Sequence, residues 1–118
     1  MGRPRKENFL RDVIDHTVKC AAQVMGVSEE DMLSKKRSLS LVDARCIAVF
    51  LLKEITPLSL TDIGTGINRH YSSVIHDYKR AQLRFIKSDM LYQRMLLALD
   101  MLEEYLDNRE NILNFKTL

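Results

Sequence analysis

The sequence lacks several features that would place it in large classes of protein. Its apolar runs all stay below the roughly 18 residues that a membrane-spanning helix needs. The start, MGRPRKENFL, has no continuous apolar segment of the kind found in secretory signals. No GxxxxGKS or GxxxxGKT motif is present, so nucleotide binding through a phosphate-binding loop is not expected. We therefore expect a cytoplasmic protein without membrane contact.

Cysteine and histidine, which carry much of metal and catalytic chemistry, are also scarce. Cys20 and Cys46 both lie in apolar helical patterns, where a buried reduced thiol is the default and a disulfide the minority interpretation. Neither has a histidine or cysteine at metal-ligand spacing. Of His16, His70 and His76, only the last two are close, and no nucleophile-base arrangement accompanies them. We predict no enzyme, no metal site and no cofactor.

What the chain does contain fits one small domain with an uneven charge distribution. The 118 residues are 46% apolar and 29% charged, with a formal net charge of +2. Residues 1–87 hold 15 Lys and Arg against 10 Asp and Glu, whereas residues 88–118 hold 3 against 6. A basic face beside an acidic tail suits a module that meets phosphates on one side, although scattered solvated lysines give similar counts.

Apolar periodicity predicts an all-α domain of about six helices. An amphipathic helix is expected over residues 7–25, followed by a short helix that Ser28 caps. Ser40 with Asp43 should cap a helix that is apolar nearly all round and ends near residue 55. We predict that this is the central buried helix, and that its cations Arg45 and Lys53 emerge at the surface.

Residues 59–87 read as a helix-turn-helix. Ser59 caps a short helix, Gly64 and Gly66 break it, and Asn68 caps a second helix. The second helix opens with polar side chains, as a helix that meets base edges in the major groove should. Any αα-hairpin with a glycine turn looks similar, and polar residues at a helix start are often only caps.

The remaining segments each allow two interpretations. Residues 1–6 form a basic, non-helical arm that either enters an A·T-rich minor groove or is simply a disordered start. Residues 34–40 form a basic loop that either contacts phosphates or is solvated surface. The helix carrying the apolar stripe of residues 91–106 either packs on the core or forms a homodimer seam. The domain should end near residue 108, with residues 109–118 as a tail.

From about Val24 to Asp77 the sequence resembles the C-terminal DNA-binding domain of the bacterial replication initiator DnaA. The resemblance is carried by "DMLSKKRS", the following helix ending in "LLKEIT", the short "SLTDIG" helix, and "RHYSSVIH". The resemblance implies a TrpR-like arrangement of the helices. In that family a helix-turn-helix reads the major groove while the basic loop places an arginine in the neighbouring minor groove. The family's ATPase module has no counterpart in this chain.

Matching positions transfer the family's roles to particular residues. The resemblance makes Arg37 the minor-groove arginine and makes Arg45 and Lys53 phosphate contacts. Arg69 matches the arginine before the recognition helix, and the other matches are Ser72, Ser73 and His76.

Several positions depart from the family's pattern. His70 and Tyr71 replace an Asp-His pair, which removes a carboxylate suited to a cytosine amino group. Leu39 and Asp43 stand where the family is usually basic, and Ala44 replaces a proline. Sequence preference should therefore differ from the family's.

These observations predict a protein that binds double-stranded DNA and serves replication or transcription control. The predicted DNA-binding residues are Lys35, Lys36, Arg37, Arg45, Lys53, Arg69, His70, Tyr71, Ser72, Ser73, His76 and Lys79. The alternative is a helical protein-protein interaction module that has lost its DNA contacts, using the stripe of residues 91–106 or the acidic tail.

Overall fold

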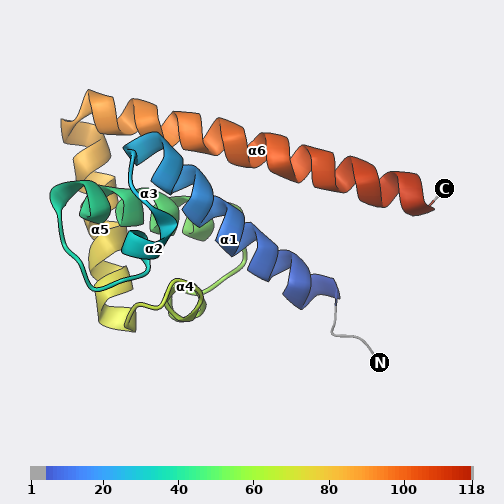
Figure 1. Cartoon of the computed structure of the whole chain (residues 1–118), viewed down its shortest axis with the longest axis horizontal. Coiled ribbons are helices and arrows are strands. Elements are labelled where there is room, and N and C mark those ends of the chain that lie inside the picture. The colour runs from blue at the N-terminus through green and yellow to red at the C-terminus, as the bar shows by residue number, and fades with distance from the viewer. Residues whose placement is uncertain (1–4, 118) are drawn as a thin grey trace.

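Six α-helices build the protein, and no strand occurs within residues 5–117 (Figure 1). The structure is a computed structural model that describes the backbone of residues 5–117 and the side chains of residues 9–109. The helices are α1 (Arg5–Met25), α2 (Glu29–Met32), α3 (Leu39–Ile55), α4 (Leu60–Gly66), α5 (Tyr71–Lys87) and α6 (Asp89–Thr117). The prediction of an all-α domain with about six helices is confirmed.

Helix α3 is the central element, as its continuous apolar character predicts. It packs against α1 on one side and α5 on another, and ten of its residues are buried. Cys46 on α3 and Cys20 on α1 are both buried free thiols. Burial raises the pKa of Cys46 to about 12, which keeps this thiol protonated.

Local sequence signals account for most helix ends. Ser28 accepts a hydrogen bond from the backbone N–H of Asp31, and Ser59 forms a full capping box with Asp62. Gly26 ends α1 at φ +68°, a conformation that costs glycine nothing. The helix start at Arg5 precedes the predicted one, and the rest of the predicted arm, residues 1–4, lies outside the described residues.

The predicted cap of α3 is wrong. The N-cap is Ser38, whose side chain accepts from the backbone N–H of Leu41 at 3.3 Å. Asp43 is instead buried, and its Oδ2 lies 2.9 Å from Nη2 of Arg84 on α5. An ion pair between helices uses this carboxylate, so it is not available at the helix end.

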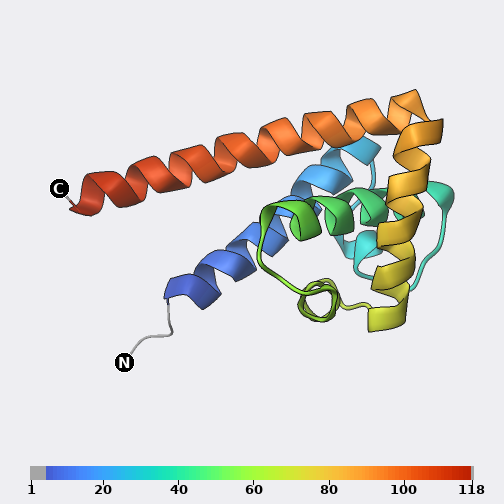
Figure 2. The ribbon, with the colours of Figure 1, turned by 180° about the vertical axis from the view of Figure 1, so that it is seen from behind.

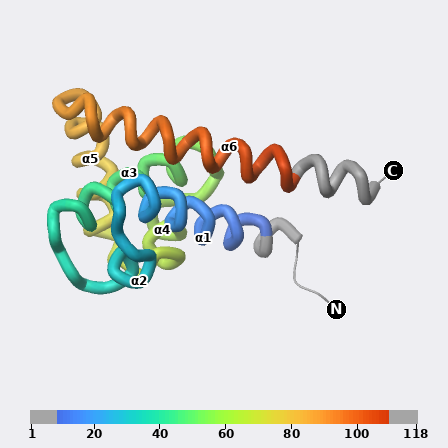
Figure 3. The backbone as a smooth tube through the Cα atoms, turned by 45° about the horizontal axis from the view of Figure 1, so that its top comes forward, coloured from blue at the N-terminus to red at the C-terminus, as the bar shows by residue number. Residues whose placement is uncertain are grey.

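Helix α6 leaves α5 at a sharp angle and runs alongside α1, away from the part of the domain formed by α2 to α5 (Figures 2 and 3). Its apolar stripe, Leu91, Met95, Ala98 and Leu102, is buried in the core. Packing within the chain, the first of the two interpretations, is thus confirmed, and these four side chains are not free to form a dimer seam. The helix backbone continues through the predicted tail to Thr117.

Two kinds of feature are absent from the described part of the chain. No helix there is both long and apolar enough to cross a membrane. The same residues contain no group of three His, Cys, Asp or Glu side chains placed to hold a metal ion.

Candidate nucleic-acid interface

The turn between α4 and α5 is closed by backbone contacts around a glycine. The N–H of Arg69 donates to the carbonyl of Gly64 at 2.8 Å. A Cβ on Gly64 would stand 2.6 Å from the carbonyl oxygen of Arg69, so only glycine allows this approach. The prediction that Gly64 and Gly66 break the helix is wrong, because α4 includes both.

Helix α5 begins later than the sequence suggested. Asn68 does not cap it, because its φ of +59° places it in the left-handed turn conformation. The N-cap is His70, whose Nδ1 accepts from the backbone N–H of Ser72 at 3.1 Å. Arg69 and His70 therefore lie before the helix, and Tyr71 is its first residue.

The loop between α2 and α3, residues 33–38, is held by the side chain of Arg45. Its Nε donates to the carbonyl of Met32 at 2.8 Å, and its Nη2 donates to the carbonyls of Ser34 at 2.8 Å and Asp31 at 3.1 Å. The prediction that Arg45 emerges at the surface is wrong, because only 1% of the residue is exposed. A guanidinium offers five N–H donors, and here Nε and Nη2 bond two carbonyls of α2 and one carbonyl of the loop.

A second contact joins this loop to the helix-turn-helix. Nδ2 of Asn68 donates to the carbonyl of Leu33 at 3.2 Å, across 35 positions of sequence. The left-handed backbone at Asn68 thus places its amide toward the loop. The basic loop and the start of α5 are adjacent on one face of the domain.

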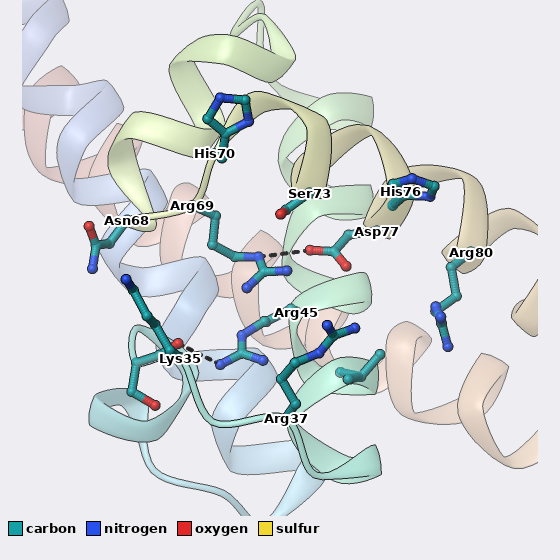
Figure 4. Close-up of a pocket in the computed structure, with 12 residues that line it drawn as sticks. Lys35, Arg37, Arg45, Asn68, Arg69, His70, Ser73, His76, Asp77 and Arg80 are labelled. Carbon is teal, nitrogen blue, oxygen red and sulfur yellow. Dashed lines mark hydrogen bonds and ion pairs between the residues drawn. The ribbon is translucent and has the colours of Figure 1, made fainter.

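Between them lies a groove of about 630 Å³ (Figure 4). Lys35 and Arg37 come from the loop side, and the start and first turns of α5 form the other side. The lining residues are Ser34, Lys35, Arg37, Val42, Arg45, Asn68, Arg69, His70, Ser73, His76, Asp77 and Arg80.

The groove is strongly cationic. Five Lys and Arg residues line it, against the single carboxylate of Asp77. Nε of Arg69 lies 3.0 Å from Oδ2 of Asp77, and both side chains are largely buried. Burial raises the pKa of Asp77, and the neighbouring Arg69 opposes this rise. The pKa of Arg45 is lowered by burial and then by the charge of Arg69.

Seven of the twelve predicted DNA-binding residues line this groove. They are Lys35, Arg37, Arg45, Arg69, His70, Ser73 and His76. The other five are not part of its lining: Lys36, Lys53, Tyr71, Ser72 and Lys79. Among these, Lys36 pairs with Asp31 at 3.0 Å, while Tyr71 and Ser72 are exposed beside the groove at the start of α5.

Arg80 is the lining cation that sequence reasoning missed. Ser73, His76, Asp77 and Arg80 recur at three- and four-residue steps, so they share one face of α5. The prediction chose the neighbouring Lys79, which is exposed but not on that face of the helix. The helical spacing from Ser73 contained the signal.

Comparison with known proteins agrees with this geometry. Residues 14–81 match the family model described as the bacterial DnaA protein helix-turn-helix. The chain belongs to this DnaA helix-turn-helix family. The match spans α1 to the middle of α5 and so includes every residue that lines the groove. The resemblance seen in the sequence is confirmed.

A curated relative matches this chain over part of the length of both proteins. The chromosomal replication initiator protein DnaA of Nitrosospira multiformis (strain ATCC 25196 / NCIMB 11849 / C 71) is 38% identical over 73 residues. These residues make up 60% of this chain and 15% of the relative. The chain therefore spans only a small part of the length of that DnaA.

Proposed function

We propose that this domain binds double-stranded DNA, with the start of α5 in the major groove and the loop of residues 33–38 at the neighbouring minor groove or backbone. The observation that carries the proposal is the cationic groove, where Lys35 and Arg37 face the first turns of a DnaA-type α5. Side chains at the start of a recognition helix contact base edges, and cations beside it contact phosphates. The process served is replication or transcription control.

The groove residues take different parts in this proposal. Lys35, Arg37, Arg69 and Arg80 are the cations assigned to phosphates or to the minor groove. Arg45, whose donors already bond two carbonyls at the end of α2 and one in the loop, is assigned to holding the loop in shape. We keep the exposed lysines Lys36, Lys53 and Lys79 as proposed contacts to the DNA backbone at the periphery of the interface.

The start of α5 supplies the groups proposed to read bases. His70, Tyr71 and Ser72 are exposed, and Ser73 and His76 face the groove. Histidine, tyrosine and serine side chains offer hydrogen-bond donors and acceptors of the kind that base edges require. The competing interaction-module hypothesis loses part of its support, because Leu91, Met95, Ala98 and Leu102 of the stripe are buried in the core and Asp43 is paired with Arg84.

Salt dependence of duplex binding tests the proposal. If Lys35, Arg37, Arg69 and Arg80 each neutralise one phosphate, they contribute about −3.6 to the slope of log K against log salt, from roughly −0.9 per phosphate contact, and each peripheral lysine that also contacts a phosphate adds about −0.9. Arg37→Ala should weaken binding and reduce the slope by about 0.9. The matched control is Lys87→Ala, which removes one exposed cation at the far end of α5 and should change neither quantity. Absence of duplex binding at low salt would refute the proposal.

A further inference from the structure

The N-cap of α5 fixes which nitrogen of His70 carries the proton. Nδ1 lies 3.1 Å from the backbone nitrogen of Ser72, which can only donate, so Nδ1 is the acceptor. Ser72 Oγ lies 2.8 Å from the same Nδ1 and directs its hydroxyl hydrogen toward it. A neutral imidazole that accepts at Nδ1 carries its hydrogen on Nε2.

The other side of the ring is presented as a single N–H donor. His70 is exposed at the rim of the groove, and no hydrogen bond within residues 9–109 engages its Nε2 (Figure 4). The cap also restricts rotation of the ring, because turning it over would remove the acceptor from the N–H of Ser72. The start of α5 therefore offers a donor in a defined position, where a carboxylate would offer only acceptors.

Base edges in the major groove differ in what they offer to such a donor. Guanine and adenine both present N7 as an acceptor, whereas cytosine presents its N4 amino group, itself a donor. Thymine presents O4 next to its C5-methyl group, which the ring would meet. Building on the proposed function, we infer that His70 is a specificity residue that selects a purine through N7 and rejects cytosine.

Two variants of His70 keep its role as the N-cap of α5 but differ in whether they present a hydrogen-bond donor to DNA. Asparagine and aspartate are both good N-caps, so His70→Asn and His70→Asp should keep the start of α5. Asparagine still offers an N–H donor outward, whereas aspartate offers only acceptors and pairs with the cytosine amino group. Selection of duplexes from a random pool with each protein should show one position where the full chain and His70→Asn select a purine and His70→Asp selects cytosine. Equal thermal midpoints of the two variants provide the control for folding.

A chemically modified duplex tests the inference with the unaltered protein. Replacing the selected purine by its 7-deaza analogue, which lacks N7, should weaken binding roughly threefold to tenfold, the effect of one hydrogen bond. The same replacement at a position that the His70 variants do not change is the control and should have no effect.

Three results would overturn the inference: a pyrimidine selected by the full chain at that position, no position that differs between the two variants, or unchanged affinity for the 7-deaza duplex. Failure of the full chain to bind any duplex would instead refute the proposed function. The two failures are therefore distinguishable.

Discussion

Replacing Arg45 by methionine should destabilise the domain strongly, because Arg45 holds the loop of residues 33–38 from inside. Methionine keeps an unbranched apolar stem of similar shape but loses all three hydrogen bonds, two to carbonyls at the end of α2 and one to a carbonyl of the loop. The fully buried bond to Met32 contributes about 2 kcal/mol, and the two partly buried bonds contribute about 1 kcal/mol each, since groove water can replace them. The sum, about 4 kcal/mol, is a large share of the roughly 5–15 kcal/mol that stabilises a domain.

Thermal unfolding followed by circular dichroism measures this loss directly. A loss of 4 kcal/mol should lower Tm by roughly 15 °C for a domain of this size. The matched control is Lys53→Met, an exposed cation on the same helix, which should change stability by less than about 0.5 kcal/mol. If Arg45→Met proves as stable as the control yet binds duplex DNA poorly, Arg45 is a phosphate contact and the loop-holding role is refuted.

Three further predictions concern the turn, a histidine and a thiol. Gly64→Ala should cost about 1–3 kcal/mol in urea unfolding because its Cβ meets the backbone of Arg69, whereas the Cβ of Gly66→Ala meets only side-chain atoms of Ile14, Cδ1 at 2.8 Å and Cγ2 at 3.2 Å, and should cost less; equal costs would contradict this. Burial lowers the pKa of His16, so the unfolded chain binds its proton more readily. Stability should fall as pH drops below about 6.5, and His16→Phe should reduce this fall; an unchanged pH profile would count against it. Cys46 should resist a thiol reagent in the native protein and react in urea; rapid native labelling would show that it is accessible.

Features set by neighbouring residues in the sequence were predictable. Ser28 and Ser59 cap helices because their hydroxyls need only a backbone N–H two or three positions on, and Gly26 ends α1 because its backbone allows positive φ. The apolar character of residues 41–52, interrupted only by Asp43 and Arg45, similarly implied a helix buried nearly all round. Each of these signals lies within one or two turns of chain.

The errors concern side chains whose partners lie far away in sequence. An arginine in an apolar helix reads as a surface cation, and only the folded loop supplies the carbonyls that take Arg45 inside. Asp43 was predicted to cap α3 because its actual partner, Arg84, is on another helix and is not visible in the local sequence. Asn68 is a preferred cap residue by composition and His70 is not, but the positive φ of Asn68 and its contact with Leu33 leave the cap to His70. No local pattern records such pairings.

The hydrogen bond between Asn68 and Leu33 has a mechanical consequence. It joins the two parts of the proposed interface, so their separation is set before any duplex arrives. Because little ordering remains to be done on contact, such a domain favours DNA whose groove spacing already matches and discriminates against duplexes that are stretched, underwound or kinked. The fixed separation would then make binding depend on the shape of the DNA duplex, independently of the bases that α5 contacts.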